Sequence, residues 1–227
     1  MQNNIAKPQD DFRLLLSRFS HEIRNPISLI NSELQMIEDS HPEVAAYSYW
    51  NDILDNLEYT KVLLDNLSDY NNADRLMPQK TDMYHYLSSV ISSIRPTYEY
   101  LGITLDTQIP ETLPTMYIDR VKLKQALLNL LRNASEAVVF PNGKAAFLVS
   151  SQNGSIHIAI KDNGCGIPAD QLEQIFTPFV TFKKNGTGLG LAITRQIIQA
   201  HGGQIQAEST PGQDTVFHIF LPEVLPG

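Results

Sequence analysis

The sequence contains very little cysteine and no long apolar run. Among its 227 residues only Cys165 is a cysteine, which excludes an intrachain disulfide and a metal site built from several thiolates. No segment reaches the roughly eighteen consecutive apolar residues needed to cross a bilayer. The N-terminus lacks the positive segment and the apolar stretch of a secretory signal. We therefore expect a soluble, cytoplasmic chain, with any membrane anchor or sensory region outside this sequence.

Positive charge and the common nucleotide-binding signatures are also scarce. Lys and Arg number 17 against 25 Asp and Glu, and this net charge of −8 argues against a protein that coats nucleic acid. No GxxxxGK[ST] segment occurs, which excludes a P-loop. The glycines of NGTGLGLAI do not closely follow a predicted strand, which argues against a dinucleotide-binding fold. The hydrophobic content of 42% and charged content of 19% are typical of a globular protein with a sizeable core.

The N-terminal third has the apolar period of helices. Between Phe12 and Ile37 the apolar residues recur every three or four positions, which predicts a long helix that ends before Pro42. A second helix over roughly residues 43–72 would make an antiparallel hairpin. Both apolar stripes are too wide to be covered by two helices, so we predict a homodimer in which two hairpins form a four-helix bundle. Alternatively, the hairpin packs on the C-terminal domain of its own chain.

The apolar period stops in the segment NNADRLMPQK. We therefore assign residues 1–74 to the helical hairpin, 75–80 to a linker and 81–227 to a second domain. In that domain the helical segments are 82–98, 119–139 and 189–200, and the alternating segments are ITLDTQI, AAFLVSS, SIHIAIKD, GQIQAES and TVFHIFLP. The chain is thus expected to be α+β, with a helical hairpin followed by a mixed helix and sheet domain.

The segment SHEIRNP carries a candidate nucleophile. His21 lies two positions from both Phe19 and Ile23 of the apolar stripe, so its imidazole is expected to face solvent. Glu22 can accept a proton from the ring, and Asn25, one helical turn further, can position water or a phosphoryl oxygen. Taken alone, a surface histidine is more often an ordinary surface residue.

The segment LLNLLRNASEA places two amides on one face of a helix. Asn129 and Asn133 are four residues apart, and amide oxygens suit Mg²⁺ that is already bound to phosphates. Arg132 and Lys124 can contact phosphate or can simply be solvated surface charges. Surface or capping amides are the weaker alternative for the asparagines, because two asparagines in a leucine-rich helix lower its helix propensity.

Two glycine-rich segments complete the candidate site. In KDNGCGIP, Asp162 ends a strand and can accept a hydrogen bond from the amine of adenine, while Gly164 and Gly166 let backbone approach a flat ligand. An ordinary Asp-Asn-Gly turn explains this segment equally well. In NGTGLGLAI, Gly186, Gly188 and Gly190 precede a helix whose N-terminal N–H groups can hold phosphates.

The segment between these glycines, IFTPFVTFKKN, combines aromatic residues with lysines. It is typical of a mobile lid that is anchored by apolar side chains, and it contains Lys183 as a candidate phosphate ligand. Packing in the core explains one or two of its aromatic residues at least as well.

In this order the motifs resemble those of bacterial two-component sensor histidine kinases, and the tyrosine-rich second helix resembles that of the sporulation kinases of bacilli. FSHEIRNP resembles the H box, LLNLLRNASEA the N box, DNGCGIP and GTGLGLAI the two glycine boxes, and IFTPFVTFK the F box. The resemblance covers nearly the whole chain, from about Phe12 to Pro222.

The resemblance implies an ATP-dependent kinase that phosphorylates itself and then an aspartate of a response regulator. It makes His21 the phosphoacceptor, Glu22 its base and Asn25 a residue of phosphotransfer or dephosphorylation. Asn133, with Asn129 nearby, would bind Mg²⁺, and Asp162 would bind adenine. The remaining nucleotide-binding positions would be Gly164, Gly166, Lys183, Gly186, Gly188 and Gly190. The family fold is a dimeric hairpin joined to an α/β sandwich that binds ATP.

The expected partners follow from the exposed bundle. Receiver domains, and any protein inhibitor that clamps the bundle, would dock near residues 21–30, while no nucleic acid is expected to bind. Two competing interpretations remain. One is a conformational ATPase clamp of the gyrase, mismatch-repair and chaperone type, which needs no SHEIRNP helix. The other is a nonenzymatic scaffold with a decayed nucleotide site.

Overall fold

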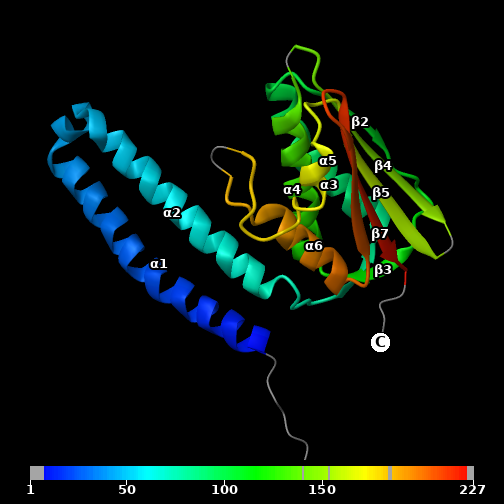
Figure 1. Ribbon diagram of the computed structural model, residues 1–227, viewed down its shortest axis with the longest axis horizontal. Helices are drawn as coiled ribbons and strands as arrows, with labels where there is room; N and C mark the ends of the chain where they lie inside the picture. Colours follow the sequence, from blue (N-terminus) through cyan, green and yellow to red (C-terminus); the bar gives the residue numbers. More distant parts are fainter. Residues whose placement is uncertain (1–7, 140, 153, 184–185, 224–227) are drawn as a thin grey trace, which may run out of the picture. The chain divides into compact units, whose positions relative to one another are not determined.

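The computed structural model describes residues 8–139, 141–152, 154–183 and 186–223, with side chains for residue 20 and for the described residues from 22 onward. Two compact units divide the chain at residues 72 and 73. The elements, in chain order, are α1 Pro8–Ser40, a 3₁₀ helix η1 Pro42–Ala46, α2 Ser48–Asn72, β1 Gln79–Asp82, α3 Met83–Tyr100, β2 Thr104–Gln108, β3 Thr115–Ile118, α4 Arg120–Ala137, β4 Lys144–Gln152, β5 Ser155–Asp162, α5 Ala169–Leu172, α6 Gly190–Ala200, β6 Gln204–Thr210 and β7 Asp214–Pro222 (Figure 1).

The first unit is a helical hairpin in which α1 and α2 pack against each other. Trp50, Leu57 and Leu64 recur every seven residues along α2 and are buried. Arg24 of α1 pairs with Asp65 of α2 at 2.8 Å, which links the two helices. Within the described residues, no helix has both the length and the apolar character needed to span a membrane.

The start of the second helix differs from the expectation. The second helix begins at Ser48 and not near Glu43, because Pro42 starts a separate 3₁₀ helix that reverses the chain. The apolar stripe of α1 is partly exposed, as expected from its width. Ile30 and Ile37 are 43% and 42% exposed, since one neighbouring helix covers only part of so wide a stripe.

The second unit contains a five-stranded sheet with the order β2-β4-β5-β7-β6. The β2–β4 pair is parallel and the other pairs are antiparallel, so the sheet is mixed. Helices α3, α4 and α6 cover one face of this sheet, which makes the predicted two-layer α/β arrangement (Figure 1). Alternate residues of β5 point into this layer, and Ile156, Ile158 and Ile160 are fully buried there.

A second, two-stranded sheet was not expected. β1 pairs with β3 in antiparallel register from Gln79↔Ile118 to Asp82↔Thr115. Residues 79 and 80, expected in the linker, therefore belong to a strand, and the helix predicted from residue 82 begins at Met83 with Asp82 as its N-cap. Strands of four residues are too short to establish an apolar period, so their pairing partner decides their conformation.

Candidate functional site

The carboxylate of Asp162 is buried at the end of β5. The residue is 2% exposed, and its Oδ1 accepts a hydrogen bond from the backbone N–H of Gly164 at 2.9 Å. A Cβ atom on Gly164 would lie 2.4 Å from the carbonyl oxygen of Ala137, so only glycine fits this turn. Burial raises the pKa of Asp162 to about 6, although the hydrogen bond from Gly164 opposes this shift. At neutral pH the group is a fixed, ionised acceptor.

The turn after Asp162 is joined directly to the C-terminal end of α4. Val138 and Gly164 form an isolated β-bridge, and the N–H of Cys165 donates to the carbonyl of Ala137 at 3.1 Å. Gly166 follows with a φ of 68°, and a Cβ there would lie 2.3 Å from the carbonyl oxygen of Thr210. The turn is therefore held on both sides by backbone, which fixes Asp162 relative to α4.

Asn129 joins α4 to the start of α6. Its Nδ2 donates to Oγ1 of Thr194 at 3.0 Å, and Thr194 in turn donates to the carbonyl of Gly190 at 3.0 Å. A Cβ on Gly190 would lie 2.6 Å from Oδ1 of Asn129. The side chain of Asn129 thus packs against the helix start that carries the second glycine box.

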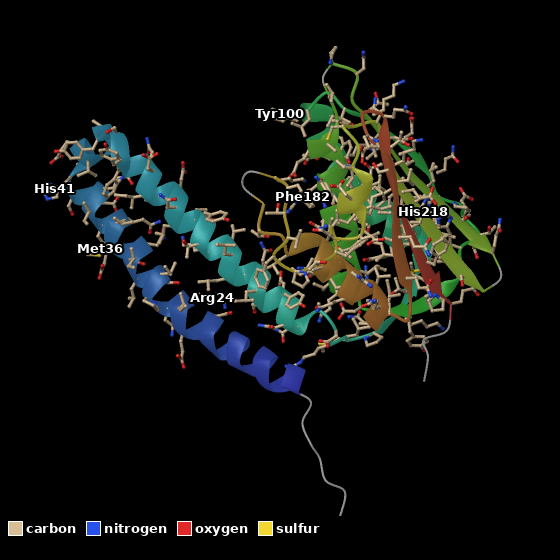
Figure 2. All side chains as sticks on the ribbon, in the orientation of Figure 1. Arg24, Met36, His41, Tyr100, Phe182 and His218 are labelled. Atoms are coloured by element: carbon tan, nitrogen blue, oxygen red, sulfur yellow. The ribbon has the colours of Figure 1, made fainter. Side chains whose placement is uncertain are left out.

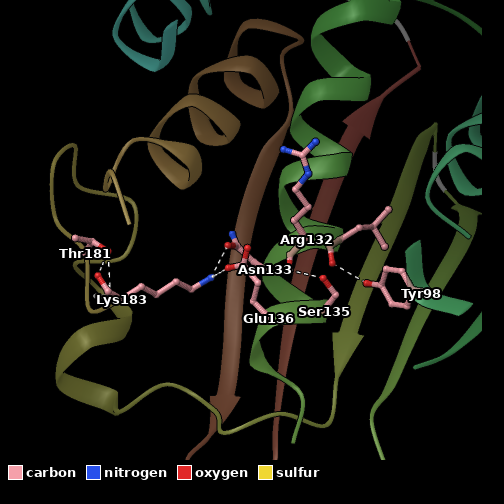
Figure 3. Close-up of polar contacts among 8 residues, drawn as sticks. Tyr98, Arg132, Asn133, Ser135, Glu136, Thr181 and Lys183 are labelled. Atoms are coloured by element: carbon pink, nitrogen blue, oxygen red, sulfur yellow. Dashed lines mark hydrogen bonds and ion pairs between the residues drawn. The ribbon is translucent and has the colours of Figure 1, made fainter. Parts of the chain in front are cut away.

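Asn133, one turn further along α4, contacts the segment before α6. Its Oδ1 accepts a hydrogen bond from Nζ of Lys183 at 2.9 Å. The same Nζ lies 2.5 Å from Oε2 of Glu136, which is also on α4. Figure 3 shows the Lys183 side chain extended toward this pair of acceptors. An amide oxygen and a carboxylate therefore both face a cation at this point of the helix.

We call residues 176–183 and 186–189 the lid segment. Its aromatic residues were expected either to belong to a lid or to pack in the core, and they differ in their exposure. Phe176 packs edge-on against Phe217 at a centroid distance of 6.3 Å, which anchors the start of the segment. Phe179 and Phe182 are 61% and 55% exposed, and Phe182 is labelled in Figure 2. Only the first of these three aromatic residues is part of the packed structure.

Glycine is required where the lid segment turns into α6. Gly188 has a φ of 67°, and a Cβ there would lie 2.5 Å from the carbonyl carbon of Phe179. The N–H of Phe179 donates to the carbonyl of Gly188 at 2.9 Å, which closes the segment on itself. Helix α6 then begins at Gly190 without a side-chain cap from Leu189. The N-terminal end of α6 is thus suited to an anionic ligand.

The residues of the H box lie in the first unit. Helix α1 continues through Pro26, and residues 21 and 25 are one turn apart on it. Glu22 and Asn25 are exposed, and the side chain of His21 lies outside the described residues. The exposure predicted for the His21 imidazole therefore stays a prediction.

Three residues that contribute to this region were not singled out in the sequence. Glu136 pairs with Lys183, and Thr194 bonds Asn129. Asn163 accepts from the N–H of Lys144 at 2.7 Å and clamps the neighbouring turn. The spacing Asn133-x-x-Glu136 placed the carboxylate on the helix face of Asn133, and this signal could have indicated its role.

Comparisons with known proteins identify relatives of this chain. The family described as "Histidine kinase-, DNA gyrase B-, and HSP90-like ATPase" matches residues 118–225, which include the asparagines of α4 and both glycine segments. Sporulation kinase E of Bacillus subtilis is 30% identical over 210 residues, covering 92% of this chain and 28% of the relative. Sporulation kinase B of the same organism is 31% identical, covering 93% and 50%. The chain thus spans half or less of these relatives.

The solved structures that resemble this chain also include histidine kinases. The catalytic domain of the histidine kinase ThkA has a TM-score of 0.58 and 31% identity over 66% of this chain and 97% of that domain. ThkA in complex with the response regulator TrrA has a TM-score of 0.65 at 27% identity, covering 92% and 61%. Full-length ShkA in complex with AMPPNP shares the fold, with a TM-score of 0.78 at 24% identity over 94% and 46%. This chain belongs to the sensor histidine kinase family.

Proposed function

We propose that the chain is the kinase core of a two-component or phosphorelay signalling protein, in which the γ-phosphoryl group of ATP passes to His21 and then to an aspartate of a response regulator. The arrangement around α4 carries this proposal. Asn133 of α4 receives the ammonium group of Lys183 at 2.9 Å, and the end of the same helix is bridged to the turn that holds Asp162. These groups match the needs of a Mg²⁺-bound nucleotide.

Asp162 would select the purine. Its carboxylate is held in one orientation by Gly164, and an ionised carboxylate accepts hydrogen bonds but donates none. It therefore favours adenine, which presents an exocyclic amine, over a base that presents a carbonyl. Gly164 and Gly166 would support this acceptor by keeping the turn closely packed, because the backbone of Ala137 and of Thr210 fills the space that a side chain at either position would need.

Asn133 fits a role as a Mg²⁺ ligand, because its Oδ1 already accepts a cationic group. Bound with the nucleotide, Mg²⁺ would neutralise phosphate charge. Asn129 would support this site from the adjacent turn, where it holds Thr194 of α6. Lys183 and the backbone around Gly186, Gly188 and Gly190 would contact the phosphates.

The phosphoryl acceptor would be a ring nitrogen of His21. Its lone pair attacks the γ-phosphorus, the bond from phosphorus to the β–γ bridging oxygen breaks, and ADP leaves. The proton on the other ring nitrogen passes to Glu22, the adjacent exposed carboxylate of α1. Asn25 lies one turn away on the same helix and would orient phosphoryl oxygens or water. For in-line attack, the nucleotide-binding unit would swing on the connection between the units and present the γ-phosphorus to the His21 ring.

We further propose that the hairpin is the homodimer interface and the docking site for partners. Leu29 and Met36 of α1 are 64% and 68% exposed and lie seven residues apart, and Tyr59 and Val62 of α2 are also more than 40% exposed. A second hairpin would bury such residues. A receiver domain, or an inhibitor that clamps the bundle, would approach residues 21–30. Because ATP is available in the cytoplasm, this core would work there.

The experiment is incubation of the purified chain with γ-labelled ATP and Mg²⁺. We expect label on the protein, and we expect neither His21→Gln nor Asn133→Asp alone to acquire it. If label reappears when the two variants are mixed, transfer occurs between protomers. Receiver domains added to labelled protein should remove the label, and dephosphorylation of a phosphorylated receiver would reveal phosphatase activity, as named for the relative NtrB of Vibrio alginolyticus.

The competing function is a conformational ATPase clamp, since the matched family also includes gyrase B and HSP90-like ATPases. Sustained release of phosphate without labelled protein would favour it. The SHEIRNP helix favours the kinase, because a clamp does not require it.

A further inference from the structure

The ion pair between Lys183 and Glu136 lies at the proposed Mg²⁺ ligand. Asn133 and Glu136 are three residues apart on α4, so both side chains leave the same face of the helix. Nζ of Lys183 reaches Oδ1 of Asn133 at 2.9 Å and Oε2 of Glu136 at 2.5 Å from a segment about fifty positions away in the sequence (Figure 3). The lysine thereby fastens the lid segment to α4 at that position.

Two cations would compete for Asn133. The ammonium group of Lys183 and a Mg²⁺ ion carry charges of the same sign, and both need the amide oxygen as a ligand or acceptor. Contact of both with one oxygen would bring like charges within a few ångströms of each other. Binding of a Mg²⁺-nucleotide at Asn133 therefore requires Lys183 to leave Oδ1.

The contact is suited to such an exchange. The side chains of Lys183 and Glu136 are 49% and 57% exposed, and exposed ion pairs are weak and screened by salt. A nucleotide carrying several negative charges can therefore compete with Glu136 for the lysine. The flexible stem of lysine allows its ammonium to move while the lid backbone stays attached.

We propose that Glu136 is a positioning residue that holds Lys183 on Asn133 in the nucleotide-free protein, so that the ammonium occupies the place of the divalent cation. This inference rests on the proposed function of Asn133. Mg²⁺-nucleotide then displaces the ammonium from Oδ1, and Lys183 transfers to the phosphates. Glu136 thus opposes binding, and it keeps the lid segment ordered until nucleotide arrives.

The test measures the dissociation constant of Mg²⁺-AMPPNP by calorimetry on the full chain. Glu136→Gln removes the charge that retains the lysine, so we expect a two- to fivefold tighter complex. In the Lys183→Met background the same change should have no effect, because the competing ammonium is already gone. The matched control is Glu111→Gln, an exposed carboxylate between β2 and β3, which should change the constant less than 1.5-fold.

Other outcomes would overturn the proposal. Weaker binding in Glu136→Gln would mean that Glu136 ligates the metal ion. Tighter binding that persists in the Lys183→Met background would mean that Glu136 acts only as a nearby negative charge.

A second measurement needs no nucleotide. The amide of Phe179, which donates to Gly188, reports on closure of the lid segment. We expect Glu136→Gln to speed its hydrogen exchange about threefold, with exchange in the middle of α6 unchanged. Unchanged exchange at Phe179 would contradict the proposal. If the unaltered chain binds no AMPPNP, the proposed function fails, while this exchange measurement still decides whether Glu136 holds the lid segment.

Discussion

Asp162 illustrates how one residue acquires a function from its surroundings. A surface aspartate is solvated and free to rotate, whereas this carboxylate is buried and held by the N–H of Gly164 at 2.9 Å. Burial costs free energy that an ordinary turn does not require. The cost is explained if the carboxylate serves as a fixed acceptor for a ligand.

The first prediction replaces this acceptor. Asp162→Asn keeps the size of the side chain, and its Oδ1 can still accept from Gly164. Its second terminal atom then becomes a donor that faces the donor amine of adenine. A lost hydrogen bond to a charged group corresponds to about 2 kcal/mol, or roughly a 30-fold increase in the dissociation constant of ADP. Calorimetry measures this change, and Asp170→Asn on α5 is the control; equal affinities for wild type and Asp162→Asn would exclude adenine recognition by this residue.

The second prediction concerns pH. Because burial raises the pKa of Asp162 to about 6, the carboxylate is ionised at pH 7.5 and becomes protonated as the pH falls through 6. Nucleotide affinity should therefore fall below pH 6, and the affinity of Asp162→Asn should lack this step. The stability effect has the opposite sign. In the unfolded chain Asp162 keeps its ordinary pKa of 3.8, so between pH 6 and 3.8 the folded protein binds more protons than the unfolded chain. The contribution of Asp162 to the free energy of unfolding therefore rises as the pH falls from 6 toward 3.8.

Single residues were predicted from sequence where their chemistry was unusual for their position. Asn133 was a candidate site residue because it interrupts a leucine-rich helix, and Asp162 was one because it ends a strand before glycines. Glu136 and Thr194 were not candidates, since helices normally carry such residues. Their roles depend on contacts with segments 47 and 65 positions away, which no local pattern contains.

At the scale of elements, Asp119 organises the start of α4. Its carboxylate accepts from the N–H groups of Val121 and Lys122 at 3.1 Å and of Met77 at 2.8 Å. Its own N–H donates to Nε2 of His201 at 3.0 Å, at the end of α6. Burial opposes ionisation of Asp119, but these backbone hydrogen bonds and the charge of Lys122 together hold its pKa below the ordinary value.

The third prediction removes this cap. Asp119→Ala leaves three backbone donors without their acceptor, so the free energy of unfolding of the second unit should fall by about 2 kcal/mol. Urea titrations followed by near-ultraviolet circular dichroism of the tyrosines measure the change. The loss of stability caused by Asp119→Ala should be smaller in acid. The lowered pKa of Asp119 stabilises the folded protein at pH values above the ordinary pKa of an aspartate, and this stabilisation is lost as the carboxylate is protonated. A loss below 0.5 kcal/mol at neutral pH would contradict the assigned role.

The regular elements of the second unit were predictable where the pattern was long. The alternation of Ile156, Ile158 and Ile160 identified β5, and the leucine-rich period identified α4.

The strands β1 and β3 were not predicted, because four residues contain too few apolar positions. The start of α2 was misplaced by five residues, since both Glu43 and Ser48 are acceptable helix starts and the reversal of the chain decides between them.

At the scale of the whole molecule, the hairpin exposes apolar side chains that a monomer would leave in water. Leu29 and Met36 lie on one face of α1, and Met36 is labelled in Figure 2. Burial of each against a second hairpin contributes about 1.5 to 3 kcal/mol. The homodimer was predicted from the width of the apolar stripes and stays a prediction, and that pattern could not indicate which apolar residues of the hairpin are exposed.

The fourth prediction tests this interface. The double change Leu29→Glu and Met36→Glu should raise the dissociation constant of the dimer by about 100-fold or more, because it removes apolar burial and adds like charges. Sedimentation velocity over a concentration series measures the constant. Tyr100→Glu, at a position that is 90% exposed in the second unit, is the control and should leave the dimer intact. A wild-type chain that sediments as a monomer at every concentration would rule out the bundle.

The most direct measurement of the central claim maps the phosphoryl group that ATP transfers. After reaction with γ-labelled ATP and Mg²⁺, digestion by trypsin at neutral pH should leave the label on the peptide FSHEIR, residues 19–24, which contains a single histidine. The account predicts a label that is stable in alkali and lost in acid, as expected of a phosphorus–nitrogen bond, and α-labelled ATP should leave this peptide unlabelled. Label on any other peptide, or an acid-stable label on the serine of this one, would contradict the assignment of His21 as the phosphoryl acceptor.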